Sequence, residues 1–328
     1  MLVDHVPRSS LPTMNVVVVG ATGGIGWHSA LAIARSAPDL QNLFLVGRNE
    51  VKGAAITKLC LDATAASQPR PTVTFFPVDL TEIPSVDAFA DRIALLVPYI
   101  NILVNAAGVI DGTPVPNKSG VEQSLVVNYL QRHRFCERLK SKLASCPGDF
   151  RSRVLIVAAP GIHWKVPIDW SGLKDSAGMN LSGLNMTRTA QKCNDVFVAE
   201  WSRRLKADGS RIDVFIYNPG LVATGLFDKQ GFVTRMILKV CFAFRFRLSL
   251  SLSSNSSAPF IQSVTACFGE PLHKSGDAPA ALVLDPSYSQ KCGSSFKGRT
   301  EIFAPSEITD ETVGRQLWDV ADALMARK

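Results

Sequence analysis

Four closely spaced glycines give the first indication of chemistry in this chain. Gly20, Gly23, Gly24 and Gly26 follow the apolar run Val16–Val19 and precede a second apolar stretch. A glycine-rich turn lets the backbone approach a phosphate group closely, and the N-terminus of a following helix offers N–H groups and a partial positive charge. The spacing therefore predicts a phosphate site, with the pyrophosphate of a dinucleotide as its ligand.

A second indication follows the next expected strand, Leu43–Gly47. An acidic residue at this point would accept hydrogen bonds from the ribose hydroxyls of NAD, whereas Arg48 suits the 2′-phosphate of NADP. We therefore expect NADP(H) as the cofactor. The alternatives are a solvated arginine in a loop, and a dinucleotide site whose affinity is weak or lost.

The elements that must position these groups alternate between strands and helices. An unbroken apolar run such as Val16–Val19 is typical of a strand buried on both faces of a parallel sheet. The pattern predicts an α/β fold, a doubly wound parallel sheet of the Rossmann type in three α/β/α layers. The strands are expected at 14–19, 43–47, 72–78, 102–104, 153–157 and 213–217.

The remaining chain is expected to extend this single domain. Residues 1–13 are a polar, flexible tail, and 14–328 form the domain, in which 259–328 are a C-terminal extension. Residues 228–258 are expected to form a lid or a membrane-surface segment. Within them, 232–252 mix basic residues with phenylalanines, which fits either a lid over the substrate or an interfacial helix whose basic groups face lipid headgroups.

Several motifs resemble the short-chain dehydrogenase/reductase family, and its retinol-dehydrogenase-like branch in particular. The pattern Gly20-x-x-x-Gly24-x-Gly26 resembles the family's glycine motif, and Asn105-Ala-Ala-Gly108 resembles its Asn-Asn-Ala-Gly. The similarity covers roughly residues 14–227 in the family's order and spacing. It implies a dinucleotide-dependent oxidoreductase on the fold described above.

The same resemblance assigns the cofactor contacts. It places Asp79-Leu80 against the adenine, and Pro219-Gly-Leu-Val-Ala-Thr224 resembles the family's clamp on the nicotinamide carboxamide and the pyrophosphate. The cofactor residues implied in this way are Gly20, Thr22, Gly23, Gly24, Ile25, Gly26, Arg48, Asp79, Leu80, Asn105, Ala106, Ala107, Gly108, Pro219, Gly220, Val222 and Thr224.

The resemblance fails where the family transfers protons. There a tyrosine is the general acid or base, a lysine four residues later lowers its pKa, and a serine hydrogen-bonds the reacting oxygen. None of the four tyrosines of this chain has a lysine four residues later. Ala159, Thr187 and Gln191 stand at the serine, tyrosine and lysine positions, while a register one residue later gives Arg188 and Lys192. The usual reductase mechanism is therefore not expected.

Other residues are candidates for a different mechanism. Asn128 matches the family's asparagine that holds a proton-relay water, but Gln131 replaces the following glycine, and Asn128 would alternatively cap the backbone at a helix irregularity. His163 and Asp169 follow the serine position on the expected substrate side, and His163 would titrate near neutrality. A packed or solvated side chain is the alternative for each. The candidate catalytic residues are His163, Asp169, Thr187, Arg188, Lys192 and Asn128, and no metal is expected.

Composition narrows the partners and the compartment. The net charge of +7 is modest, and no basic cluster alternates with aromatic residues, so nucleic acid is not expected. Seven irregularly spaced cysteines and no signal peptide indicate a reducing compartment. We expect a cytoplasmic protein with a small-molecule substrate, either free or peripheral on an intracellular membrane through 232–252. A homo-oligomer would form if the expected helix 121–143, the usual dimer interface of the family, pairs with a second copy.

Three functions fit these patterns. The first is an NADP(H)-binding enzyme with a changed mechanism, which reduces a pre-activated substrate such as an iminium ion. In its other form, the same enzyme guides the isomerisation or cyclisation of a small, specialised-metabolite-like molecule. The second is an ordinary NADP-dependent carbonyl or alcohol oxidoreductase with a displaced acid such as His163. The third is a non-catalytic dinucleotide-binding sensor or partner subunit, a pseudoenzyme. The retained cofactor motifs and the altered proton machinery favour the first.

Overall fold

The structure is a computed structural model that describes residues 13–67, 69–110, 113–159, 164–165, 167–181, 183–220, 222 and 272–327. Two expected site residues, His163 and Thr224, lie outside the described residues. The same holds for the segment 228–258, with its basic stretch 232–252, and for the first twelve residues of the tail.

A single sheet runs through the described part of the chain. Its strand order is β3-β2-β1-β4-β5-β6-β7-β8, parallel throughout except for the antiparallel pair β7–β8. The direction of winding reverses between β1 and β4, the switch point at which such sheets bind ligands. The predicted doubly wound α/β fold is confirmed. The strands are β1 Met14–Val19, β2 Leu40–Gly47, β3 Thr72–Pro77, β4 Ile102–Asn105, β5 Ser152–Val157, β6 Ile212–Asn218, β7 Ser295–Lys297 and β8 Thr300–Ile302.

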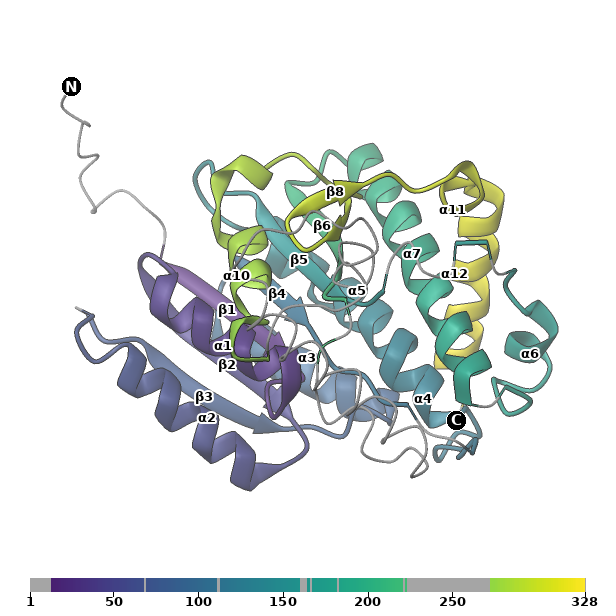
Figure 1. Cartoon of the computed structure of the whole chain (residues 1–328), viewed down its shortest axis with the longest axis horizontal. Helices are drawn as coiled ribbons and strands as arrows, with labels where there is room; N and C mark the ends of the chain where they lie inside the picture. Colours follow the sequence, from purple (N-terminus) through teal and green to yellow (C-terminus); the bar gives the residue numbers. More distant parts are fainter. Residues whose placement is uncertain are drawn as a thin grey trace, which may run out of the picture.

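Helices cover both faces of this sheet (Figure 1). The strand β1 shows why, because Val16 and Val18 belong to one apolar core and Val17 and Val19 to the other. Helices α1, α2 and α10 pack on the first face, and α3, α5 and α7 on the second. The helices are α1 Gly24–Ser36, α2 Glu50–Ala63, α3 Ile83–Leu96, α4 Gln123–Leu125, the π-helix η2 Val126–Leu130, α5 Gln131–Ala144, α6 Trp170–Lys174, α7 Gly183–Ala207, η4 Leu272–Lys274, α10 Asp277–Leu284, η5 Pro286–Tyr288, α11 Ser306–Thr309 and α12 Glu311–Met325.

The C-terminal helix α12 lies outside α7, with its apolar side toward the core (Figure 1). The Trp318 ring lies 4.3 Å from the ring of His133 on α5 and 5.8 Å from that of Phe197 on α7. Burial in this aromatic cluster lowers the pKa of His133 to about 3. The oligomer expected through helix 121–143 remains a prediction.

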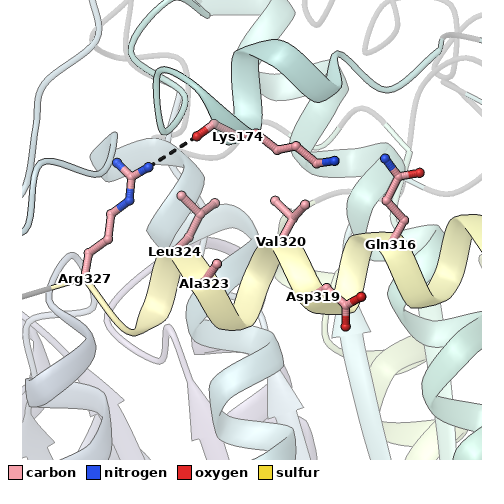
Figure 2. A pocket seen from close by; sticks show the side chains of 7 residues that line it. All are labelled: Lys174, Gln316, Asp319, Val320, Ala323, Leu324 and Arg327. Atoms are coloured by element: carbon pink, nitrogen blue, oxygen red, sulfur yellow. Dashed lines mark hydrogen bonds between the residues drawn. The ribbon is translucent and has the colours of Figure 1, made fainter.

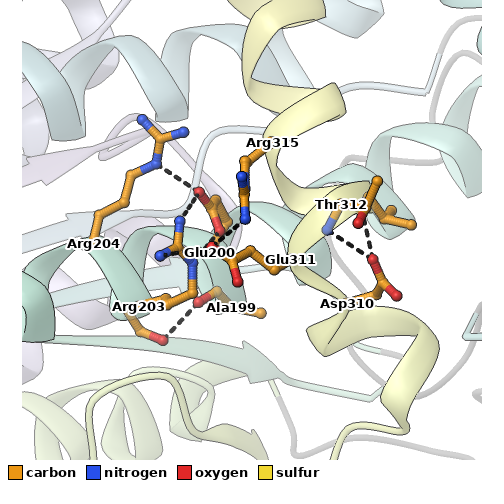
Figure 3. A network of polar contacts seen from close by, with 10 residues as sticks. Ala199, Glu200, Arg203, Arg204, Asp310, Glu311, Thr312 and Arg315 are labelled. Carbon is orange, nitrogen blue, oxygen red and sulfur yellow. Dashed lines mark hydrogen bonds and ion pairs between the residues drawn. The ribbon is translucent and has the colours of Figure 1, made fainter.

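A polar network fastens α12 to α7 (Figure 3). The buried carboxylate of Glu200 accepts hydrogen bonds from Arg203 at 2.8 Å and Arg204 at 2.7 Å. Arg203 also contacts Glu311 at 3.2 Å, and Glu311 contacts Arg315 at 2.6 Å. Because its charge is paired on α7 itself, Glu200 can stay buried under α12 without an uncompensated desolvation cost.

None of the helices among the described residues combines the length and apolar character needed to cross a membrane.

Candidate functional site

The glycine turn between β1 and α1 has no room for side chains at two of its positions. Gly20 has φ +85°, and a Cβ placed on it would lie 2.6 Å from the amide nitrogen of Ala107. A Cβ on Gly26 would lie 2.3 Å from the carbonyl oxygen of Gly20. Gly23 precedes α1, and no side chain caps the helix there. The first N–H groups of α1 therefore have no capping side chain, as an anion site at a helix N-terminus requires.

The end of β2 lies beside this turn. The side chain of Thr22 packs on Gly47, where a Cβ would lie 2.6 Å from Cγ2 of Thr22. Arg48 comes next in the chain and is exposed, and the side chain of Asn49 accepts the Lys52 N–H at 2.9 Å to cap α2. The fold therefore brings Thr22 and Arg48 to the same edge of the sheet, and the cofactor contacts assigned to them stay predictions.

The turn after β3 uses its aspartate locally. Asp79 Oδ1 accepts hydrogen bonds from the backbone N–H of Thr81 at 3.0 Å and from its hydroxyl at 2.8 Å. The carboxylate is exposed, while Leu80 packs against the apolar core. Both residues lie at the same edge of the sheet as the glycine turn, so the adenine contact assigned to them stays a prediction consistent with their placement.

At the end of β4, a buried amide pair joins the strand to the following helix. Asn105 Nδ2 donates to Gln131 Oε1 at 2.9 Å, and Gln131 Nε2 donates to Asn105 Oδ1 at 3.1 Å. The next residue, Ala106, donates its N–H to the carbonyl of Val19 at 2.9 Å. Gln131, which departs from the family's glycine, therefore fixes the strand end on which Ala106, Ala107 and Gly108 follow.

The side chain of Asn128 forms hydrogen bonds with the backbone of Val109. It lies in the π-helix η2, where its Oδ1 accepts from the N–H of Val109 and its Nδ2 donates to the carbonyl of Val109, both at 2.8 Å. Its own carbonyl accepts from Asn194 Nδ2 at 2.8 Å. These contacts match the capping alternative at a helix irregularity.

The two residues predicted to stand at the family's serine and lysine positions are bonded to each other. The N–H of Ala159 donates to Gln191 Oε1 at 2.8 Å. Lys192 instead donates to the carbonyl oxygen of Trp164. The structure therefore places Gln191, and not Lys192, at the end of β5, while Thr187 and Arg188 lie earlier on the same helix, half-buried and exposed.

One acidic residue of α7 was missed by the sequence comparison. Asp195 is 3% exposed, and burial raises its pKa to about 8, although the indole of Trp164 and the charge of Lys192 oppose the shift. Neither carboxylate oxygen has a hydrogen-bond partner in the described part of the chain. The sequence signal was an acidic residue directly before the apolar run 196–198. Recognising it requires working out which residues of the helix face the core.

Asp169 has a local structural role. Its Oδ1 accepts from the N–H of Gly172 at 2.8 Å and from the hydroxyl of Ser171 at 2.9 Å, so it caps α6. The hydrogen bond from Gly172 lowers the pKa of this exposed carboxyl. Such a group is ionised at neutral pH, which makes it a poor proton donor.

The expected clamp after β6 is described in part. Asn218 Oδ1 accepts the N–H of Gly220 at 2.8 Å, and Gly220 has φ +69°, so Pro219 and Gly220 lie in a tight turn at the strand end. Val222 is buried.

Two grooves lie elsewhere on the molecule. A groove of about 320 Å³ separates α6 from α12, with Val320, Ala323 and Leu324 on its floor, and Arg327 donates across it to the Lys174 carbonyl at 3.3 Å (Figure 2). Another, of about 640 Å³, lies between α2 and β3. Neither contains any of the predicted cofactor or catalytic residues.

Comparisons with known proteins agree with this geometry. The family described as short chain dehydrogenase matches residues 14–135. Human retinol dehydrogenase 11 is 26% identical over 319 residues, which are 96% of this chain and 86% of that protein. Human polyprenol dehydrogenase is 22% identical over 229 residues, 70% of this chain and 67% of that protein.

A solved structure supports the fold independently. An uncharacterised protein from Mycobacterium paratuberculosis superposes with a TM-score of 0.63 at 19% identity, over 98% of this chain and 97% of that one. At this identity the likeness concerns the arrangement of strands and helices.

Proposed function

Because the chain belongs to the short-chain dehydrogenase/reductase family and is similar to its retinol dehydrogenases, we propose that it is an NADP(H)-binding enzyme that works without the family's proton donor. The glycine turn is the observation that carries the proposal. Gly20 and Gly26 leave no space for a Cβ, and a turn this close to the Ala107 backbone and to the start of α1 fits a pyrophosphate.

The preference for NADP(H) rests on the end of β2. Arg48 follows the strand directly and is exposed, the side chain of Thr22 packs on the preceding Gly47, and no acidic residue follows the strand directly. A guanidinium suits a phosphate because it offers several N–H donors and a permanent charge. The 2′-phosphate would therefore bind Arg48.

The type of reaction follows from the altered half of the site. A bound NADPH would supply a hydride. If the hydride went to a carbonyl carbon, the oxygen would become an alkoxide that needs a proton, and Ala159 has no group that can bind it. The amide of Gln191, already bonded to the Ala159 N–H, has no proton to give at neutral pH. Hydride addition to an iminium ion gives a neutral amine and needs no proton, so we propose a pre-activated substrate of this kind.

Titration with NADPH and NADH tests the cofactor assignment. We expect NADPH to bind at least about tenfold more tightly than NADH, a difference of about 1.4 kcal/mol. Arg48→Ala should remove the difference, because only NADPH carries the 2′-phosphate. Arg70→Ala, which removes an exposed arginine outside the predicted site, should keep it. Equal affinities in the unmutated protein would contradict the assignment.

Turnover with matched substrates tests the mechanism. A cyclic iminium ion and the ketone of the same ring size are each mixed with the protein and NADPH, and loss of NADPH absorbance is followed. We expect reduction of the iminium ion only. Faster reduction of the ketone would show that a proton donor exists, and would favour the ordinary carbonyl reductase.

A further inference from the structure

We propose that Arg132 is the cation of an anion-binding site beneath the turn that follows β4. The residue lies on α5, one helical turn after Asn128, and is 2% exposed. Its Nη2 donates to the carbonyl oxygen of Ala107 at 2.5 Å. The guanidinium therefore lies directly behind the stretch Ala107–Gly108, which belongs to the predicted cofactor site.

The charge of Arg132 is not compensated by the described residues. Nε and Nη1 have no hydrogen-bond partner there. The ionisable group that acts on it is the thiol of Cys136, and burial raises the pKa of that thiol well above its ordinary value, so it stays neutral. A buried cation with two donors unused is costly unless something negative pairs with it.

Beside Gly108 there is room for one further atom, on the side of the guanidinium whose Nη2 donates to the Ala107 carbonyl. A Cβ placed on Gly108 would meet only two atoms within 4 Å, Asn128 Oδ1 at 3.5 Å and Arg132 Nη2 at 3.9 Å. Gly108 itself is exposed. An oxygen atom of a ligand that occupied this position would lie close to Nη2, and its charge would determine whether it binds.

The ligand chemistry is an anionic oxygen. Two sources can supply it, the phosphates of the dinucleotide, since Gly20 lies against Ala107, or a carboxylate on the substrate. The choice between these sources rests on the proposed function, whereas the anion site itself does not. A buried guanidinium attracts either group more strongly than an exposed one, because water does not screen it.

The test uses the full chain and four variants. Arg132→Gln keeps amide donors for the Ala107 carbonyl but removes the charge, and Arg132→Lys keeps the charge. Gly108→Ala fills the space beside Gly108, and should fold because its contacts would be ordinary and its φ is not in the left-handed region. Arg138→Gln is the control, since this residue lies on the same helix but is paired with Asp91 at the surface.

Two binding assays separate the sources. Calorimetry measures the affinity for NADPH and for NADH. Binding of a bare carboxylate is measured as the rise in Tm that sodium formate causes, compared with sodium chloride at equal ionic strength. If the dinucleotide supplies the anion, Arg132→Gln and Gly108→Ala should weaken both dinucleotides about tenfold or more, because both carry the pyrophosphate. If the substrate supplies it, the same variants should leave dinucleotide affinity unchanged and abolish the effect of formate. Arg132→Lys and Arg138→Gln should bind as the unmutated protein does in either case.

The thermal stability of the variants distinguishes an anion site from a purely structural role of Arg132. Without ligand, Arg132→Gln should raise Tm by at least about 2 °C, because it removes an uncompensated buried charge. A fall in Tm together with unchanged dinucleotide and formate binding would overturn the proposal. If the unmutated protein bound no dinucleotide but formate still acted through Arg132, the proposed function would fail while the anion site stood.

Discussion

Two regions of the candidate site lie at the same edge of the sheet, one at the ends of β1 and β4 and the other at the end of β5. They depend on different features of the sequence. The first region depends on residues without a side chain, because Gly20 and Gly26 allow two backbone segments to pack directly against each other. The second depends in the family on side chains that are present, and here they are Ala159 and Gln191, joined by one hydrogen bond.

This difference explains how one half of a site can keep its form while the other changes. A backbone cradle is tied to the packing of β1, β4 and α1, so most substitutions in it would disturb the core itself. Catalytic side chains at the end of β5 have no such structural task. In the proposed register, Ala159 and Gln191 join β5 to α7 by one hydrogen bond, and Thr187 stands where the family has its tyrosine acid.

The largest effect is expected from adding a side chain in the glycine turn between β1 and α1. Gly20→Ala would place a Cβ 2.6 Å from the Ala107 nitrogen at a left-handed φ, so the turn would have to move. We expect a loss of about 3 kcal/mol in NADPH binding, roughly a hundredfold in Kd, measured by calorimetry.

A matched glycine controls for this change. Gly23→Ala meets nothing within 4 Å and has an extended φ of 179°, so its Tm should equal that of the unmutated protein while Gly20→Ala lowers it. Similar Tm values for the two variants would show that the turn is not rigid, and the comparison of the two regions would lose its basis.

A smaller gain is expected from restoring the other half. The combined change Ala159→Ser, Thr187→Tyr and Gln191→Lys supplies the hydroxyl, the acid and the cation, and positioned acid–base groups contribute about a hundredfold or more in natural sites. We expect roughly a tenfold rise in NADPH-dependent reduction of a simple aldehyde, followed by absorbance. Gln191→Lys alone should give no gain, because no acid is present for the lysine to activate.

The outcome of this restoration bears on the proposed mechanism. A variant that folds, binds NADPH and still reduces no aldehyde would mean that something other than these three side chains prevents carbonyl reduction. The region after β5 would then differ from the family in its backbone as well.

The sheet was predictable because its strands contain runs of consecutive apolar residues, such as Val16–Val19 in β1 and Val214–Tyr217 in β6. Helix faces were harder. The spacing of Val51, Ala55 and Leu59 looks like a buried face of α2, but Val51 is 82% and Leu59 40% exposed, while Gly53, Ile56 and Cys60 face the core. Gly53 accounts for this, because it lets the helix lie directly on the Phe75 ring, where a Cβ would be only 2.4 Å from Cε1.

The placement of the candidate site residues in the fold was predictable where a motif determines the backbone. It was not predictable where a single side chain forms a hydrogen bond with a distant segment. The positions of the glycine turn, of Arg48 and of Gln191 follow from spacing along strands and helices. The pairing of Gln131 with Asn105, the burial of Arg132 and the capping by Asp169 depend on contacts between distant segments. No local pattern contains that information.

The last expected effect concerns the stability of the region after β5 and its dependence on pH. Asp195 has an ordinary pKa of 3.8 and about 8 in the folded protein, so between these values the folded chain holds a proton that the unfolded chain releases. Stability should therefore fall as pH rises through this window, and Asp195→Asn should remove the fall.

Urea unfolding of both proteins across this range measures the difference. His133 contributes in the opposite direction, since its pKa drops from 6.5 to about 3 on folding and acid destabilises it, so only the difference between variant and unmutated protein isolates Asp195. Parallel stability curves would mean that Asp195 is ionised and paired in solution. In that case its partners would be Lys192 and the Trp164 indole, and the region after β5 would hold an ion pair instead of a buried acid.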